Sequence, residues 1–304
     1  MRRSLAAALL LVALALGATP LSARAYCRMT TSTRAPTPSN PCVTDGIPLA
    51  WHHRCSEIAF YNGSDTLALA QVRDIFDRSF MKWETVECGG VLPGFDVRLV
   101  DNSSLCDRAE YNRDGRNVQS MVFVQDGDWE PRGYDSNAYA VTTVWHNTGT
   151  GEIYDVDMEI NEGRGPYAVC DATSGCSDGH TVDLENVVTH EAGHYFGMGH
   201  TPDSVLATMY AISPPGEVLK RVLKSDDTDG FCAAYGGDVL NAECDYNPRG
   251  GLKLSCGEDS GGCGCTTVAA REPAHTDDTG ALTGGAAAAA TAMLVARRRR
   301  RRPA

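Results

Sequence analysis

Three histidines and a glutamate lie close together between His190 and His200, and their spacing suits a metal ion. His190 and His194 are four residues apart, so a helix would present both imidazoles on one face. Glu191 lies one step further round, too far to bind the same ion but able to contact a water bound to it. Gly197 lets the chain turn sharply, because glycine tolerates positive φ, and the turn would bring His200 back as a third ligand.

This set of ligands indicates a catalytic zinc rather than a structural one. Three protein ligands leave a fourth position for water, which is typical of catalytic zinc sites. The alternative is a helix that carries surface histidines. It is disfavoured because the extended pattern specifies several positions at once, and because it follows both an export signal and a helix cap at Asp183.

The run His190–His200 resembles the zinc-binding motif of the metzincin peptidases. Two details resemble the matrixin branch, the matrix-metalloproteinase-like peptidases: Thr201 follows the third histidine, and residues 207–210, Ala-Thr-Met-Tyr, are similar to the matrixin Met-turn. Astacins and serralysins place a zinc-binding tyrosine two residues after the methionine. Tyr210 follows Met209 directly, so it is not assigned as a ligand. The resemblance extends over about residues 48–235.

The resemblance implies a zinc-dependent endopeptidase that acts on proteins or peptides. One catalytic zinc would be held by His190, His194 and His200, with Gly197 and Met209 as supporting residues and Met209 as an apolar floor beneath the metal. Glu191 would accept a proton from zinc-bound water, whose pKa falls to about 7, and pass it to the leaving amine. The alternative is a catalytically silent, surface-displayed binding or structural module that retains the fold. The intact Glu191 argues against that alternative.

Substrate binding is expected along the sheet. An extended peptide would pair with an edge strand near Ile153 to Ile160, in the mode of β-augmentation. A pocket beside the zinc-binding helix, walled by the stretch from Tyr210 to Gly216, would set the preference for a substrate side chain.

Two matrixin features have no clear counterpart. The segment around Cys42 resembles a cysteine switch only loosely, and we expect Cys42 to be disulfide-bonded. The H-x-D pattern of the matrixin structural zinc is absent, because the spacing of His146, Asp155, Asp157 and His180 differs. These four are interpreted as ordinary loop and strand-surface residues. A calcium site is left open, without a location.

The elements that must position the motif indicate an α/β fold. Strands with an early crossing helix and a late helix predict a metzincin-like catalytic domain with a twisted mixed sheet and about three helices. The expected strands are 48–51 with 58–61, then 95–100, 121–124, 138–145 and 153–160. Three helices are expected. The first is capped by Ser64 or Asp65 and runs to about Glu87, the second covers Leu184–Phe196, and the third covers Asp226–Tyr235.

The start of the chain is typical of a secretory signal peptide. Two arginines precede the apolar run 5–16, and Ala23-Arg24-Ala25 supplies a cleavage site. A membrane-spanning start is the alternative, but this run is short against the roughly 20 residues that a span needs. Export explains the 12 cysteines. Ten of them lie outside the Cys263 and Cys265 cluster and can form five disulfides of open connectivity, with Cys170 and Cys176 close enough to pin a local loop.

The charge of the chain argues against nucleic-acid binding. The formal net charge is −12, but nine of the 27 basic residues lie in the signal and in a terminal arginine block. Without them, 18 basic residues stand against 39 acidic ones, so the processed body carries a charge near −21. Binding to phosphates needs the opposite sign.

The C-terminus has the order of a sorting signal. The Cys263 and Cys265 cluster is followed by a polar spacer, the small apolar segment 280–296 and the arginines 297–302. This order resembles the myxobacterial C-terminal sorting tail, which implies transient anchoring at the inner membrane with the arginines inside, and then cleavage near the cysteines. The protein would be extracellular or on the surface of a Gram-negative, myxobacterial-type cell. The alternative is a disordered Ala-rich tail.

The expected organisation therefore has five parts. They are a signal peptide (1–25), a Cys- and Pro-rich lead-in (26–46), the catalytic domain (47–240), a Cys- and Gly-rich segment (241–265), and a tail (266–304) with a spacer, a short apolar segment and an Arg-rich end.

Overall fold

The computed structural model describes most of the chain between the expected signal and the expected tail. It covers residues 26–37, 39–100, 104–202, 204–237, 240 and 243–257, and the backbone of 286–295. The predicted signal peptide, the Cys263 and Cys265 cluster and the arginine block lie outside the described residues.

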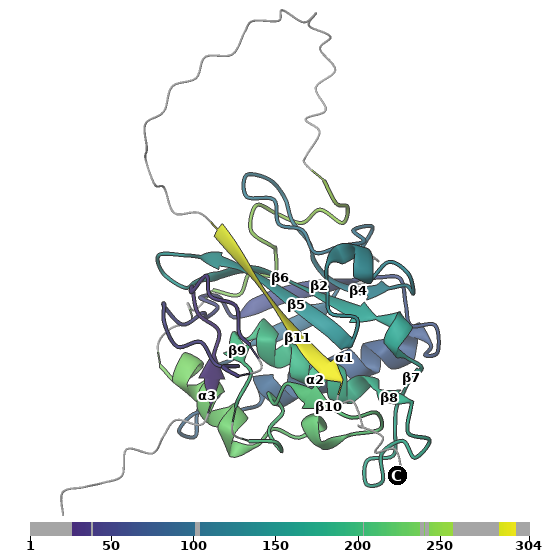
Figure 1. The fold of residues 1–304 in the computed structure, drawn as a ribbon. Helices are drawn as coiled ribbons and strands as arrows, with labels where there is room; N and C mark the ends of the chain where they lie inside the picture. Colours follow the sequence, from purple (N-terminus) through teal and green to yellow (C-terminus); the bar gives the residue numbers. More distant parts are fainter. Residues whose placement is uncertain are drawn as a thin grey trace, which may run out of the picture.

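A mixed seven-stranded sheet forms the centre of the fold, as the strand pattern predicts (Figure 1). The strand order is β10-β11-β5-β6-β4-β2-β3. The strands β2, β3, β4 and β6 are parallel to one another, and β5 runs antiparallel to both β6 and β11. The strands span Cys55–Tyr61 (β2), Asp96–Leu99 (β3), Gln119–Val124 (β4), Ala138–Asn147 (β5), Ile153–Asn161 (β6), Ile212–Ser213 (β10) and Ala286–Val295 (β11).

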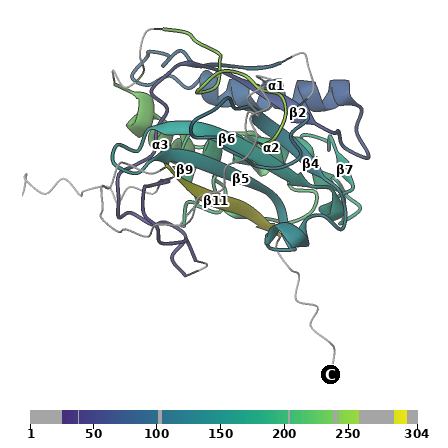
Figure 2. The same cartoon turned by 90° about the horizontal axis from the view of Figure 1, so that it is seen from above.

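The three predicted helices are present, and two of them pack together on one face of the sheet (Figures 1 and 2). They are α1 (Leu69–Glu84), α2 (Leu184–Tyr195) and α3 (Ser225–Tyr235). Short strands pair outside the main sheet: β1 (Cys27–Arg28) with β9 (Met198–Gly199), and β7 (Tyr167–Ala168) with β8 (Val182–Asp183). Three short 3-10 turns complete the fold, at Glu130–Arg132, Glu162–Arg164 and Leu219–Arg221.

The first helix begins later than predicted. Its N-cap position is Ala68, whose backbone N–H donates to the side chain of Gln71. Ser64 instead accepts a hydrogen bond from the backbone of Thr66, and the Thr66 hydroxyl donates to the carbonyl of Tyr167. The segment that was expected to start the helix is therefore docked against β7. The apolar side chains of α1 are largely buried, at Val72, Ile75, Phe76, Phe80 and Trp83.

One expectation about the sheet is wrong. The strand near Ile153 to Ile160 is not an edge, because β6 lies between β5 and β4. On the side of β5 away from β6, the neighbour is β11, which comes from the far end of the chain. The strand β6 is thus an interior strand, and β5 and β11 lie between it and β10.

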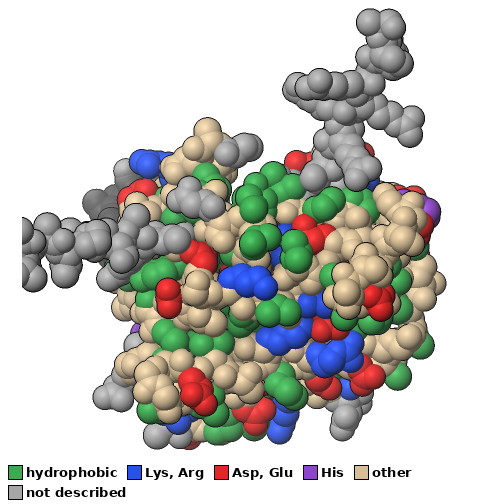
Figure 3. All heavy atoms as spheres, turned by 90° about the horizontal axis from the view of Figure 1, so that it is seen from below, with side chains coloured by type: hydrophobic (Ala, Val, Ile, Leu, Met, Phe, Trp, Pro, Cys, Tyr) green, Lys and Arg blue, Asp and Glu red, His purple; other side chains and the backbone are tan. Residues whose placement is uncertain are grey.

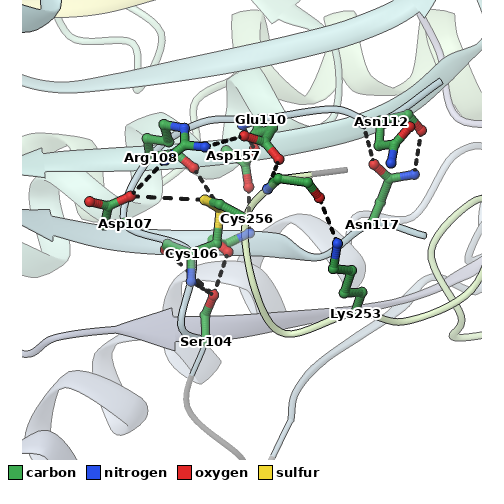
Figure 4. The surroundings of a disulfide bond; sticks show 12 residues. Ser104, Cys106, Asp107, Arg108, Glu110, Asn112, Asn117, Asp157, Lys253 and Cys256 are labelled. Atoms are coloured by element: carbon green, nitrogen blue, oxygen red, sulfur yellow. Dashed lines mark hydrogen bonds and ion pairs between the residues drawn. A yellow bond between two sulfur atoms is a disulfide. The ribbon is translucent and has the colours of Figure 1, made fainter. Parts of the chain in front are cut away.

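The other face of the sheet is covered by two loops that a disulfide joins. Residues 104–118 and 243–257 meet there through Cys106–Cys256, and Cys55–Cys244 fastens the second segment to β2. Figure 4 shows Asp157 of β6 close to this bridge, and the backbone of Glu110 donates to it at 3.0 Å. We call residues 243–257 the strap.

All ten cysteines that were expected to pair do so. The five disulfides are Cys27–Cys42, Cys55–Cys244, Cys88–Cys232, Cys106–Cys256 and Cys170–Cys176. Cys42 is thus bonded as predicted, and Cys170–Cys176 closes a local loop.

The surface below the helices mixes both signs of charge. Figure 3 shows Lys and Arg side chains near the centre of this face, with Asp and Glu side chains among them.

Ion pairs also join α1 to α2, since Arg78 and Lys82 both contact Glu185. Within the part of the chain that the structure describes, no helix is both long and apolar enough to cross a membrane.

Candidate metal centre

The helix α2 carries most of the site and begins where the sequence predicts. The Asp183 side chain accepts a hydrogen bond of 2.7 Å from the backbone of Asn186, which caps the helix. Arg221 in turn donates to Asp183, so the cap is held from both sides. Every residue of α2 is buried, and the side chains of His190, Glu191 and His194 are fully enclosed.

Three imidazoles converge at one point. Nε2 of His200 lies 3.2 Å from Nε2 of His190 and 3.1 Å from Nε2 of His194. The Nδ1 atoms of His190 and His194 lie 2.6 and 2.7 Å from the backbone oxygens of Thr208 and Met198. A carbonyl oxygen only accepts, so each of these Nδ1 atoms carries the proton and each Nε2 presents a lone pair.

Lone pairs that face one another at this distance repel unless a cation lies between them. The donor set therefore fits a metal ion that imidazole binds well, and zinc is the common choice for three histidines. Among the described residues, these three histidines are the one group of His, Cys, Asp or Glu that converges in this way.

The protonation of the three histidines agrees with this role. Burial lowers the pKa of all three, that of His194 to about 4, and the neighbouring imidazoles lower the pKa of His190 and His200 further. Neutral imidazole is the form that binds metal, so the triad is ready to bind at neutral pH.

Glu191 is buried beside the triad with few partners. Its Oε2 accepts a hydrogen bond of 2.5 Å from the hydroxyl of Thr142 on β5. Its Oε1 has no hydrogen-bond partner among the described residues, although it is buried. Burial raises the pKa of Glu191 to about 8, and the Thr142 hydroxyl acts in the opposite direction. A carboxylate with one bonded and one open oxygen can take up and release a proton.

The turn after α2 depends on Gly197. Its φ is +79°, and a Cβ at this position would lie 2.7 Å from the backbone oxygen of Leu49. The chain then continues through β9 to His200, which is how the third imidazole returns to the first two.

Met209 lies directly against α2. A Cβ at Gly193 would come within 2.1 Å of the Met209 sulfur and 2.7 Å of the Trp83 ring, so only glycine fits there. The backbone amides of Thr208 and Met209 each donate to Asp227 of α3 at 2.9 Å. The third helix therefore holds the Met-turn in place.

Four residues that were predicted to be ordinary surface or loop positions divide into two groups. His180 is exposed and lies beside Asp178, as expected. His146, Asp155 and Asp157 are buried instead, each at most 2% exposed, so their interpretation as surface residues is wrong. The loop and strap cover the outer face, where Asp157 accepts from the backbone of Glu110. His146 instead lies within the sheet, paired with Ile153 on β6 and Ala287 on β11.

Two residues of the site escaped the sequence analysis. Thr142 contacts Glu191 from a strand 49 residues away, and nothing in the sequence marks it. Asp227 does have a signal, since acidic residues cluster in the first turn of α3. That signal predicts helix capping and gives no hint of the Met-turn.

The course of α2, the turn at Gly197 and the methionine beneath the helix place this chain in the metzincin class. Comparison with known proteins narrows the class. Residues 113–236 match the family model of the matrixins, and the chain is a matrixin-like metzincin. Its fold and triad are thus those of a metallopeptidase family that works with zinc.

Curated relatives give the same family. A segment of 66 residues is 41% identical to human matrix metalloproteinase-25, covering 21% of this chain and 12% of that protein. A longer segment of 193 residues is 26% identical to metalloendoproteinase 5-MMP of Arabidopsis thaliana, covering 62% of this chain and 46% of the relative. Metalloendoproteinase 1 of Glycine max is 46% identical over 54 residues, or 18% of this chain and 17% of that protein. The matched parts span less than half the length of these relatives.

Proposed function

We propose that this chain is an exported zinc endopeptidase, with zinc bound by His190, His194 and His200. The observation that carries the proposal is the convergence of three neutral imidazoles beside a buried carboxylate with one open oxygen. The matrixin match supports the same activity.

Glu191 acts as the general base. When bound, zinc polarises the scissile carbonyl and lowers the pKa of a bound water. Oε1 of Glu191 accepts the proton of that water and later donates it to the leaving amine. The Thr142 hydroxyl holds Oε2, so the carboxylate keeps one orientation while Oε1 gains and loses the proton.

The substrate is an extended peptide that lies along β5. The strand β11 supports this, because its backbone pairs antiparallel with β5 and parallel with β10 (Figure 1). The space between β5 and β10, which we call the groove, therefore accommodates one extended strand. Thr142 lies within the paired part of β5, so a peptide in this groove passes beside Glu191. The stretch from Tyr210 to Gly216 contains β10 and forms the far wall.

Export and sorting complete the proposal. A signal peptide ending at Ala25 is removed, and the tail after about residue 266 holds the protein at the inner membrane until a cut near Cys263 or Cys265 releases it or leaves it at the cell surface. The five disulfides support an oxidising compartment. Intact-mass analysis of the protein from its host tests this, since a soluble product that still ends at Ala304 contradicts it.

One experiment separates the peptidase from a silent module with the same fold. Bound zinc is measured in the purified protein, and cleavage of unfolded casein is followed before and after treatment with a chelator. The peptidase contains about one zinc per chain and cleaves casein until the metal is removed. Zinc without cleavage in the processed protein would favour the silent module.

A further inference from the structure

The lead-in lies against the third histidine of the site. Cys27 and Arg28 pair with Gly199 and Met198 in a short antiparallel ladder, and the backbone of Met29 donates to Gly197 at 2.9 Å. The disulfide Cys27–Cys42 closes the following residues into a loop. This loop lies outside the segment that matches the matrixin family, so it is a feature of this chain beyond that match.

A hollow lies between this loop and His200. Its apolar lining comes from Met29, Pro36, Pro41 and Val43, and its inner end is formed by Gly199 and His200. Because His200 belongs to the triad, anything in the hollow is next to the metal centre. The hollow therefore adjoins the third histidine of the site.

The position of the loop along the groove follows from a chain of backbone hydrogen bonds. Leu49 donates to Met29, Ala50 donates to Gly151, and Gly151 donates to Asn147 at the end of β5. The lead-in therefore stands at the C-terminal end of β5. Figures 1 and 2 show it beside β9, at the end of the groove where β11 begins.

The direction of the strands decides which part of a peptide reaches the loop. β11 is antiparallel to β5, with Ala286 opposite Asn147 and Leu294 opposite Ala138. A peptide that pairs in the same sense brings its N-terminal residues to the Asn147 end. The residues that precede the scissile bond would then lie beside the lead-in.

The charges around the hollow favour an apolar occupant. Two cations line the hollow, Arg28 and Arg34. The Arg28 guanidinium donates to the backbone oxygen of Leu49, and that of Arg34 lies 3.3 Å from a carboxylate oxygen of Asp45. The hydroxyl of Ser32 donates to the same carboxylate at 2.9 Å. Since the charge of Arg34 is already balanced, it offers little to an acidic side chain, while the four apolar residues of the lining remain available.

We propose that the disulfide-closed lead-in is a specificity wall, which receives an apolar substrate side chain from the N-terminal side of the scissile bond. The proposal rests on the proposed peptidase function. It identifies Pro36 as the lining residue best suited to a test, because its side chain is exposed and a substitution there leaves the core intact.

The probe is a set of acetylated tripeptide hydroxamates added to the zinc-loaded full chain. The hydroxamate binds zinc and fixes the register, so the three residues occupy only the N-terminal side of the site. Each position carries Val, Asp or Lys in turn, and affinity is measured by calorimetry, which does not depend on turnover. The variants are Pro36→Asp and the matched control Thr33→Asp, which is also exposed but does not line the hollow.

The expected result is a preference for Val over Asp at one position, which Pro36→Asp weakens by about tenfold and Thr33→Asp leaves unchanged. Any cost of displacing β11 is common to all three proteins and cancels in the comparison. Equal affinity for Val and Asp at every position would overturn the proposal. A preference for Asp would also overturn it, because Arg34 and not the apolar lining would then contact the substrate. If zinc is bound but no hydroxamate binds, the proposed function itself fails and the wall with it.

Discussion

The two faces of the sheet each bury a glutamate, and they treat it in opposite ways. On the outer face, Glu159 is 1% exposed and receives hydrogen bonds from both Arg132 and Tyr134. On the helix face, Glu191 is fully buried and receives one hydrogen bond, from Thr142.

This difference separates a carboxylate that supports the fold from one that is available for chemistry. A buried charge is costly unless donors surround it, and Arg132 and Tyr134 provide such donors to Glu159. Glu191 lacks them, and its pKa is raised to about 8 as a result. For Glu191 this cost falls beside three imidazoles that converge on a metal position.

The largest effect is expected from removing the carboxylate of Glu191, the one on the helix face. Glu191→Ala should retain zinc and lose casein cleavage by about 10²–10⁴-fold, the usual contribution of a general base. The matched control is Glu159→Gln, which removes a buried carboxylate from the other face and should keep its activity per folded molecule. Equal losses in both variants would contradict the separation of roles.

Removal of a metal ligand should come next. His200→Ala should weaken zinc binding by more than the roughly 10–100-fold that is typical of outer partners of a metal site. Zinc content after dialysis against a competing chelator measures this. The control is His180→Ala, an exposed histidine outside the triad. A variant that keeps both zinc and activity without His200 would exclude this residue as a ligand.

The raised pKa of Glu191 gives a sharper test in the metal-free protein. The folded pKa is about 8 and the ordinary value is 4.5, so the unfolded chain releases its proton first as the pH rises. The native protein therefore loses stability between these two values. Glu191→Gln cannot ionise, so its advantage over the native protein should grow from near zero at pH 4 to about 2–5 kcal/mol at pH 9. Urea unfolding at both pH values measures it, and a constant difference would show that Glu191 is not buried as described.

Glu159→Gln should lower the stability of the protein, whereas Glu191→Gln raises it. It leaves Arg132 facing a neutral amide, and since Arg132 is 22% exposed, we expect a loss of about 1–3 kcal/mol in the free energy of unfolding at pH 7. The same urea experiment measures this loss. A stabilising effect at pH 7 would show that the two carboxylates are not treated differently.

The smallest expected effect is a change in hydroxamate affinity when β11 is removed and the strap is kept. The strap on the outer face is fastened by two disulfides, whereas β11 is held to β5 by backbone pairing. A chain that ends at Gly257 leaves the strap in place and frees the edge of β5. It should bind the Val hydroxamate about two- to tenfold more tightly than the full chain, because an internal competitor is gone. Unchanged affinity would mean that β11 does not compete for the groove.

The sequence predicted the parts of the site that are local in the chain. The spacing of His190 and His194, the cap at Asp183 and the glycine at 197 all lie within one short run, so periodicity and backbone preference were enough to place α2 and its exit. The core strands were recognised for the same reason, although their order in the sheet was not.

The parts that were missed depend on contacts between distant residues. The hydrogen bond from Thr142 to Glu191 exists because β5 lies over α2, which no local pattern reveals. The interior position of β6 was missed because alternating strands look alike whether they lie at an edge or not. The strap could not be placed because ten cysteines allow many pairings.

The long disulfides have a consequence for how the chain responds to proteolysis. Cys55–Cys244, Cys88–Cys232 and Cys106–Cys256 each join an early part of the chain to a late one. A single nick anywhere between residues 106 and 232 would leave the two fragments joined by all three bridges. A first proteolytic cut in this region would therefore release nothing, and the fragments would separate only once the bridges were reduced.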